Sequence, residues 1–190
     1  ENLPLVAPSG FREYDARWLF PDQINLVGVQ ALGLGLGTLI HEFGVTPKIA
    51  VGHDYRSYSA SIKQALIIGL MEAGCEVHDI GLALWTGVKM GAQRPLTFGP
   101  DEMSRLKEIV LSGGGKARDG GRYIRVDDMA ERYIADLTGR PKIKRKLKVV
   151  AACGNGTAGA FAPQVLEGIG VEVIALDCEL DYTFPRYNPN

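Results

Sequence analysis

The sequence lacks several features that would assign it at once to a broad class of protein. It has no excess of one charge, because 21 Lys and Arg stand against 22 Asp and Glu for a net charge of −1, and this balance offers no basic field for nucleic acid. It contains no apolar run of the roughly 18 residues that a membrane span needs. Its first residues, ENLPLVAPSG, lack the charged and apolar parts of a secretory leader. We therefore expect a cytoplasmic protein that binds neither membrane nor nucleic acid.

Patterns typical of disulfides and of metal sites are also missing. The chain has three widely separated cysteines without a C-x-x-C pair: Cys75, Cys153 and Cys178. An odd, dispersed set fits buried thiols in a reducing compartment better than disulfides or zinc. The three histidines fall in different predicted elements, and we assign them no catalytic or metal-binding role: His41, His53 and His78.

What is present is an alternation of apolar segments and turn signals over 190 residues, enough for one large domain or two small ones. Leucines at helical spacing predict a first helix from Pro21 to Phe43, with Asp22 as a cap at its start and Gly44 at its end. The glycines of LGLGLG, Leu32–Gly37, count against a helix, since each costs about 1 kcal/mol relative to alanine, and their period of two also suits a strand. Close packing against a neighbouring backbone would explain them.

An internal repeat organises most of the remaining sequence. KIAVGHDYRSYSASIKQALIIGLMEAGCEVHDIG and KVVAACGNGTAGAFAPQVLEGIGVEVIALD share an apolar strand, a polar loop, a helix, a glycine and a second strand. The helices are expected at Ser59–Ala73 and Ala160–Ile169, with shorter helices between the repeats. Two successive βαβ units predict an α/β fold with mixed sheets sandwiched between helices. The expected domains are residues 1–125 and 126–190.

Ligands of such sheets gather beyond the carboxyl ends of the strands, which directs attention to two loops. GNGTAG, Gly154–Gly159, fits G-x-G-x-x-G and is followed by Asp177 at the end of the next strand, a pattern typical of dinucleotide binding. The alternative is a tight turn that needs small residues, which the first repeat favours because its equivalent loop, GHDYRS, has no such glycines. In that loop Asp54 and Arg56 form either a structural pair or part of a phosphate site, and we favour the pair.

FREYDARW, Phe11–Trp18, combines arginines, acids and aromatics ahead of the first helix. It is either a solvated N-terminal arm or a loop that presents Tyr14 and Arg17 to an anionic ligand, because a guanidinium suits bidentate phosphate contact. The residues themselves leave both readings open.

The ordered combination of FREYDARW, the first repeat, TGVKMG, the second repeat and DYTFPRYNPN resembles the α-D-phosphohexomutases, and within them the bacterial phosphomannomutase/phosphoglucomutase group. The resemblance implies domain I and part of domain II of that fold. It also implies transfer of a phosphoryl group from a phosphoserine to a hexose phosphate, a hexose 1,6-bisphosphate intermediate, Mg²⁺ on an Asp-rich loop and a glucose or mannose 1,6-bisphosphate activator. The dinucleotide reading becomes the minor alternative.

The resemblance also implies roles for three residues. Tyr14 and Arg17 match the substrate- and phosphate-binding loop of the family, and Arg17 is in addition a catalytic candidate. Lys89 in TGVK matches the lysine that assists proton transfer or orients the phosphoryl group. Without the resemblance, Lys89 would be read as a strand lysine whose stem lies along apolar surface.

The sequence departs from the family pattern where the nucleophile should be. GLAL meets WTGVK directly at Leu84–Trp85, no Ser-His pair occurs in the chain, and the Asp-rich metal loop and domains III and IV are not in it. Either the chain is a fragment of a longer mutase, or it is a shortened sugar-phosphate-binding module without catalysis. Parallel neighbouring strands need a crossover of about a dozen residues or more, which favours the fragment. We therefore expect the parent protein to be a mutase and this chain alone to be inactive.

Overall fold

The computed structural model describes residues 3–82, 90–91, 97–140 and 142–187, and its contacts divide the chain into two compact units. Unit 1 comprises the described residues of Glu1–Gly52, Ala60–Asp79 and Thr86–Arg125, and unit 2 those of His53–Ser59, Ile80–Trp85 and Val126–Asn190. Two short segments thus group with unit 2 although they precede residue 126, and the domain ranges 1–125 and 126–190 stay a prediction.

The first long helix of unit 1, α1 (Leu26–Glu42), begins later than predicted. Asn25 rather than Asp22 caps it: the Asn25 side chain accepts a hydrogen bond of 2.7 Å from the amide of Gly28 and donates one of 2.8 Å to the carbonyl of Leu3. The residues from Pro21 to Ile24 form a turn and an isolated bridge instead. At the other end, Gly44 follows the helix with φ of +66°, so the predicted stop is confirmed.

Glycines inside α1 serve close packing, and Gly33 does so against α2 (Ser59–Glu72). A Cβ atom on Gly33 would collide with the carbonyl oxygen of Leu66, and one on Gly69 with the carbonyl oxygen of Gln30. Each helix thus has a glycine where the backbone of the other helix approaches it, Gly33 on α1 and Gly69 on α2. The prediction of a helix with packing glycines is confirmed, and the strand alternative for Leu32–Gly37 is wrong.

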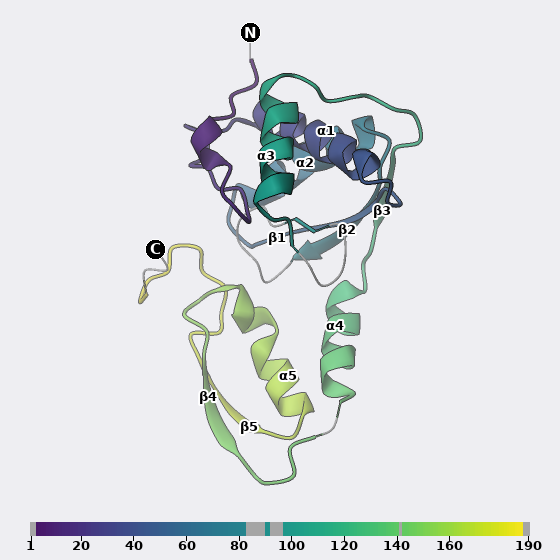
Figure 1. Cartoon of the computed structure of the whole chain (residues 1–190). Helices are drawn as coiled ribbons and strands as arrows, with labels where there is room; N and C mark the ends of the chain where they lie inside the picture. Colours follow the sequence, from purple (N-terminus) through teal and green to yellow (C-terminus); the bar gives the residue numbers. More distant parts are fainter. Residues whose placement is uncertain (1–2, 83–89, 92–96, 141, 188–190) are drawn as a thin grey trace. The chain divides into compact units, whose positions relative to one another are not determined.

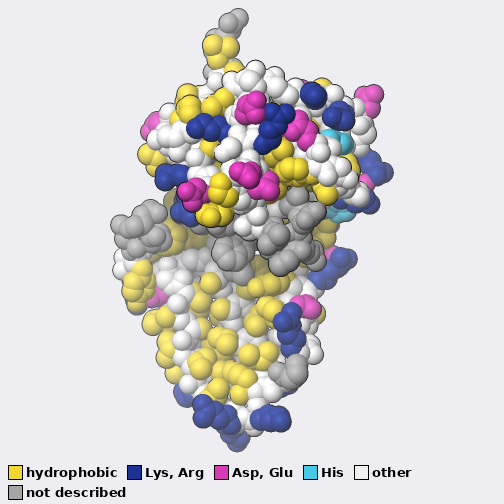
Figure 2. Space-filling view, in the orientation of Figure 1, with side chains coloured by type: hydrophobic (Ala, Val, Ile, Leu, Met, Phe, Trp, Pro, Cys, Tyr) yellow, Lys and Arg dark blue, Asp and Glu magenta, His cyan; other side chains and the backbone are white. Residues whose placement is uncertain are grey.

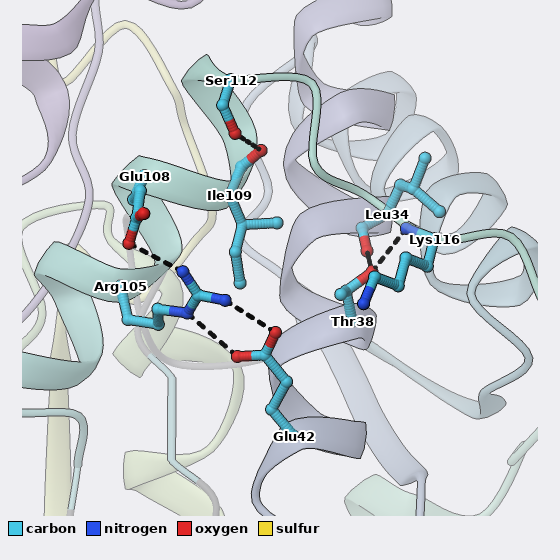
Figure 3. Close-up of polar contacts among 8 residues, drawn as sticks. All are labelled: Leu34, Thr38, Glu42, Arg105, Glu108, Ile109, Ser112 and Lys116. Atoms are coloured by element: carbon cyan, nitrogen blue, oxygen red, sulfur yellow. Dashed lines mark hydrogen bonds and ion pairs between the residues drawn. The ribbon is translucent and has the colours of Figure 1, made fainter.

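A third helix, α3 (Pro100–Leu111), packs against α1 and is linked to it by polar contacts (Figure 3). Arg105 donates through Nε and Nη2 to the two carboxylate oxygens of Glu42 at 3.0 and 2.9 Å, and through Nη1 to Glu108 at 2.7 Å. The hydrogen bond from Arg105 lowers the pKa of Glu42. Beyond α3, the amide of Lys116 donates to Thr38 Oγ1 at 2.9 Å. These bonds hold the chain after α3 against α1.

The sheet of unit 1 has the order β1 (Lys48–His53), β2 (Glu76–Leu82), β3 (Arg122–Arg125), and β2 and β3 are parallel with Glu76 opposite Arg122. In the view of Figure 1, α1, α2 and α3 lie above these strands. Between helices and sheet is one apolar cluster, whose fully buried members include Leu32, Leu70 and Leu106.

One charged pair is buried in unit 1. Lys63 of α2 donates to both carboxylate oxygens of Asp79 on β2 at 2.7 Å, and both side chains are more than nine-tenths buried. Tyr123 of β3 adds a third hydrogen bond to Asp79, at 2.9 Å. Since all three groups lie on different elements, this network connects α2, β2 and β3.

Unit 2 contains α4 (Met129–Thr138), β4 (Lys148–Ala152), a 3₁₀ turn η2 (Thr157–Ala160), α5 (Ala162–Gly168) and β5 (Glu172–Leu176). β4 and β5 are parallel, with Val150 opposite Ile174. The predicted helix Ala160–Ile169 is shorter than expected, because Phe161 leaves the helical region and α5 begins anew after it. Pro163 explains the break, since it has no amide hydrogen to continue the preceding turn.

One face of the β4–β5 pair is apolar and exposed. Val150, Ile174 and Leu176 are 57%, 46% and 37% accessible, and neither α4 nor α5 contains a buried residue. Figure 2 shows hydrophobic side chains gathered over the part of the molecule that carries these strands in Figure 1.

The predicted α/β class, with strands and helices in alternation and parallel strand pairs, is confirmed. In the described part of the chain, no helix has both the length and the apolar character required to cross a bilayer.

Candidate active-site loop

The loop Phe11–Trp18 is a closed turn at the start of unit 1. Phe11 and Ala16 form an antiparallel bridge, the amide of Arg12 donates to the carbonyl of Asp15 at 2.9 Å, and that of Arg17 donates to Gly10 at 2.8 Å. These bonds bring the two ends of the loop together and leave the residues between them at its tip. The loop is therefore ordered by its own backbone.

Aromatic packing fixes the base of this loop. Trp18 donates from Nε1 to the carbonyl of Ala7 at 2.8 Å, and its ring meets that of Phe11 edge to face at 5.1 Å. Gly10 ends the short turn η1 (Pro8–Gly10) beneath the indole, where a Cβ atom would collide with the Trp18 ring. Gly10, Phe11 and Trp18 thus anchor the charged residues that lie between the two aromatics.

Arg17 is exposed but held in place by Asp15. Its Nε donates to Asp15 Oδ2 at 2.9 Å, its Nη2 lies 2.9 Å from the same oxygen in an ion pair, and the side chains are 63% and 12% accessible. A guanidinium has five N–H donors, so a bond to one carboxylate oxygen leaves donors for a second anion. Our sequence reasoning overlooked Asp15 as the residue that orients Arg17, although the D-A-R spacing after a turn is a usable signal for it.

Tyr14 lies at the tip of the same loop and is 58% accessible. The structure thus places two of the three predicted site residues, Tyr14 and Arg17, on one loop whose base is anchored. The third, Lys89, lies outside the described residues, as does the Leu84–Trp85 junction. A phenol and a guanidinium together are suited to donate hydrogen bonds to an anionic ligand.

In the loop after β1, Asp54 and Arg56 form the structural pair that we favoured from the sequence. Asp54 is buried and accepts hydrogen bonds from the Arg56 amide at 3.2 Å and from the Ser59 hydroxyl, and the Arg56 Nε lies 3.4 Å from its carboxylate. Asp54 thereby organises the start of α2. Burial opposes the charge on Arg56, but the hydrogen bond to Tyr58 and the charge of Asp54 raise its pKa overall.

Tyr55, in the same loop, was also missed. Its hydroxyl lies 2.7 Å from the carbonyl oxygen of Asn155 and 3.2 Å from that of Asp181, and its ring meets Phe184 at 6.0 Å. Burial raises the pKa of this phenol, so it remains a donor at neutral pH. Tyr55 and the three residues that it contacts all belong to unit 2.

The turn Gly154–Gly159 is explained by backbone packing. Gly154 has φ of +55°, and a Cβ atom on Gly159 would collide with the carbonyl oxygen of Cys178. Asp177, the acid expected to bind ribose in the dinucleotide reading, lies 3.4 Å from the guanidinium of Arg186. The turn leads into the 3₁₀ turn η2 rather than directly into an α-helix. Nothing in these contacts supports the dinucleotide alternative.

A metal site needs several ligating side chains close together. The described parts of the chain contain no group of three or more His, Cys, Asp or Glu side chains that could hold a metal ion. The described residues therefore do not form a site that fits Mg²⁺.

Comparison with known proteins identifies the relatives of this chain. The family model for phosphoglucomutase/phosphomannomutase α/β/α domain I matches residues 8–97, and that for domain II matches residues 131–190. The phosphomannomutase/phosphoglucomutase of Pseudomonas putida is 32% identical over 99% of this chain, and that of Pseudomonas aeruginosa is 29% identical over 100%.

The chain spans about half the length of these curated relatives, 46% of each of the two. The alignment with the P. putida protein runs over 215 positions although this chain has 190 residues, so the relative carries residues that have no counterpart here.

The fold agrees with a solved structure. A crystal structure of a phosphoglucomutase/phosphomannomutase family protein from Burkholderia thailandensis matches 97% of this chain with a TM-score of 0.83 at 22% identity, and 47% of that chain is covered. The two consecutive domain matches, together with this agreement, show that the chain belongs to the phosphoglucomutase/phosphomannomutase family.

Proposed function

We propose that the parent protein of this chain interconverts hexose 1-phosphate and hexose 6-phosphate through a phosphoserine and a hexose 1,6-bisphosphate. The observation that carries the proposal is the match of domain I followed by domain II, in order, over most of the 190 residues. Names of the relatives include both phosphomannomutase and phosphoglucomutase, so mannose and glucose phosphates are the substrate class. The proposal includes a cytoplasmic location, Mg²⁺ and a bisphosphate activator, as well as the further domains III and IV.

The loop Phe11–Trp18 supplies the part of the chemistry that this chain carries. In the proposal, Arg17 donates to the phosphate of the substrate and offsets charge on the transferring group, while Asp15 fixes the direction of the guanidinium. Tyr14 donates its hydroxyl from the tip of the loop. Lys89 would transfer a proton or orient the phosphoryl group.

We further propose that this chain alone does not turn over substrate, because it has no Ser-His pair to act as the phosphorylated nucleophile. The test is a mutase assay on the purified chain with mannose 1-phosphate, glucose 1,6-bisphosphate and Mg²⁺, in which the 6-phosphate is measured by a coupled dehydrogenase. We expect no product above the blank. Robust turnover would show that the nucleophile is not missing.

A binding experiment tests the loop separately from catalysis. NMR titration of the chain with mannose 1-phosphate should shift the signals of the loop, and Arg17→Ala should weaken binding about tenfold, the loss expected for a charge-assisted hydrogen bond. Arg12→Ala removes the same charge from the same loop and is the matched control. Equal effects of the two substitutions would contradict a specific role for Arg17.

A further inference from the structure

The two cysteines of unit 2 lie side by side, although 25 residues separate them in sequence. The sulfur atoms of Cys153 and Cys178 are 3.5 Å apart, and Cys178 Sγ also lies 3.2 Å from the carbonyl oxygen of Ala151. Both thiols are free and partly accessible, whereas Cys75 in unit 1 is fully buried. The dispersed spacing that argued against disulfides thus conceals one close pair.

The parallel strands create this proximity. β4 and β5 pair as far as Ala152 and Leu176, so Cys153 directly follows one strand and Cys178 follows the other after one residue. The amide of Cys153 donates to the carbonyl of Leu176 at 3.0 Å, which continues the ladder past the strands. A backbone hydrogen bond therefore holds Cys153 at the carboxyl end of β4, and Cys178 lies two residues beyond the end of β5.

The turn that follows β4 packs on the backbone of Cys178. Its carbonyl lies where a Cβ atom of Gly159 would be, so the turn after β4 packs directly on it. The sulfur atoms need to move together by about 1.5 Å to reach bonding distance, which side-chain rotation can supply.

We propose that Cys153 and Cys178 form a reversible intrachain disulfide when a hydroperoxide oxidises the protein. In the first step the sulfur of one thiol attacks the peroxide, the O–O bond breaks, and a sulfenic acid and water form. In the second step the other sulfur attacks the sulfenic sulfur, the S–O bond breaks, and its proton leaves with the hydroxide as water. Overall, two thiols and one H₂O₂ give one disulfide and two waters, and a dithiol reductant reverses the change.

The test uses the full purified chain, reduced and then treated with H₂O₂. After alkylation in denaturant, the mass should show the loss of two hydrogens and a single alkylated cysteine, which mapping should place at Cys75. Trypsin leaves the pair in one peptide, because no Lys or Arg lies between Cys153 and Cys178. A glutamyl endopeptidase cuts at Glu167 and Glu172 and should release two peptides joined by the disulfide.

Single substitutions test the pair. Cys153→Ser and Cys178→Ser each remove the thiol that resolves the sulfenic acid, so each variant should accumulate a sulfenic acid that dimedone traps, whereas the unmodified chain should trap about tenfold less. Equal trapping in the unmodified chain and in the two variants would overturn the pair. Independent oxidation of all three cysteines in the unmodified chain would overturn the pair itself.

A measurement without substitutions guards against misfolded variants. In denaturant the chain should form all possible pairs of its three cysteines, including those with Cys75, whereas the folded chain should form only Cys153–Cys178. The yield in the folded chain should also be independent of protein concentration. Dimers linked by disulfides, or the same mixture of pairs with and without denaturant, would contradict the proposal.

Discussion

Unit 1 and unit 2 share a strand–helix–strand order, yet they bury very different amounts of apolar surface. In unit 1, α1 alone contains ten buried residues, and α2 and α3 contribute to the same cluster. In unit 2, α4 and α5 contain none, and one face of the β4–β5 pair stays exposed. The repeat therefore specifies local elements, whereas burial depends on what packs on them: unit 1 adds α1, α3 and a third strand. A two-stranded sheet is marginal without such additional layers.

The largest expected effect comes from the buried ion pair of unit 1. Lys63→Met leaves the Asp79 carboxylate buried without its cation, so we expect the free energy of unfolding to fall by about 3–5 kcal/mol. Lys148→Met is the matched change in unit 2, where the Lys148–Glu172 pair is exposed on both sides, and should cost about 0–1 kcal/mol. Urea unfolding measures both. Similar losses would remove the contrast between the units.

Apolar burial gives the second test. Leu70 is fully buried, and Leu70→Ala should lower the free energy of unfolding by about 2–5 kcal/mol through lost burial and a cavity. Val150 on the exposed face of β4 should tolerate Val150→Ala with a change of about 0.5 kcal/mol or less. A large loss for Val150→Ala, seen in the same urea titration, would mean that this face is covered in solution.

Replacing a helical glycine by alanine usually raises stability, but at the contact between α1 and α2 we expect it to lower stability. Gly69→Ala would normally gain about 1 kcal/mol, but its Cβ collides with the backbone of Gln30, so we expect a loss of about 1–3 kcal/mol. Ser61→Ala, at an exposed position of the same helix, should gain a few tenths of a kcal/mol. Calorimetric melting temperatures should move in opposite directions, and a gain for Gly69→Ala would show that the helices are not in contact there.

The smallest effect concerns alkaline pH. Burial raises the pKa values of Cys75 and Cys153 to about 11, from an ordinary value of 9.0. Above pH 9 the unfolded chain loses these protons while the folded chain keeps them, so the unfolded state binds fewer protons and stability falls as pH rises to about 11. The contribution is complete below pH 9. A pKa difference of one corresponds to about 1.4 kcal/mol per group; solvent screening lowers this nominal value, and we expect a total loss of about 1–2 kcal/mol across this window.

Cysteine variants separate the thiols from other groups that ionise at high pH. Cys75→Ala and Cys153→Ala should each flatten the dependence of the free energy of unfolding on pH, one in unit 1 and the other in unit 2. Parallel curves for the variants and the unmodified chain would show that the thiols do not cause the decline.

Much of the fold could be predicted because local signals agree with it. Gly44 and Gly74 stop α1 and α2 with positive φ, and the two repeats predict their strands. The start of α1 could not be predicted, since Asp22 and Asn25 are both competent caps, and only contacts with distant Leu3 and Leu5 select Asn25. The burial of Lys63 was equally hidden, because the apolar pattern of α2 does not reveal a partner on β2.

The candidate site could be predicted only in part, for a similar reason. Tyr14 and Arg17 belong to one continuous motif, so their proximity follows from the sequence. The closeness of Cys153 and Cys178 depends on the register of two parallel strands, which spacing along the chain does not indicate. Lys89 stays a prediction outside the described residues.

The Tyr55 hydroxyl has a consequence for how this chain is made and divided. Its two carbonyl neighbours lie 100 and 126 residues further along, so Tyr55 leaves the ribosome long before the residues that it contacts. Contacts of such wide separation form late in folding, and unit 2 is complete only when this early segment has been joined to it. A peptide of residues 126–190 would therefore lack both a hydrogen-bond donor and an aromatic neighbour of Phe184. Residues 126–190 alone do not contain the whole of the second unit.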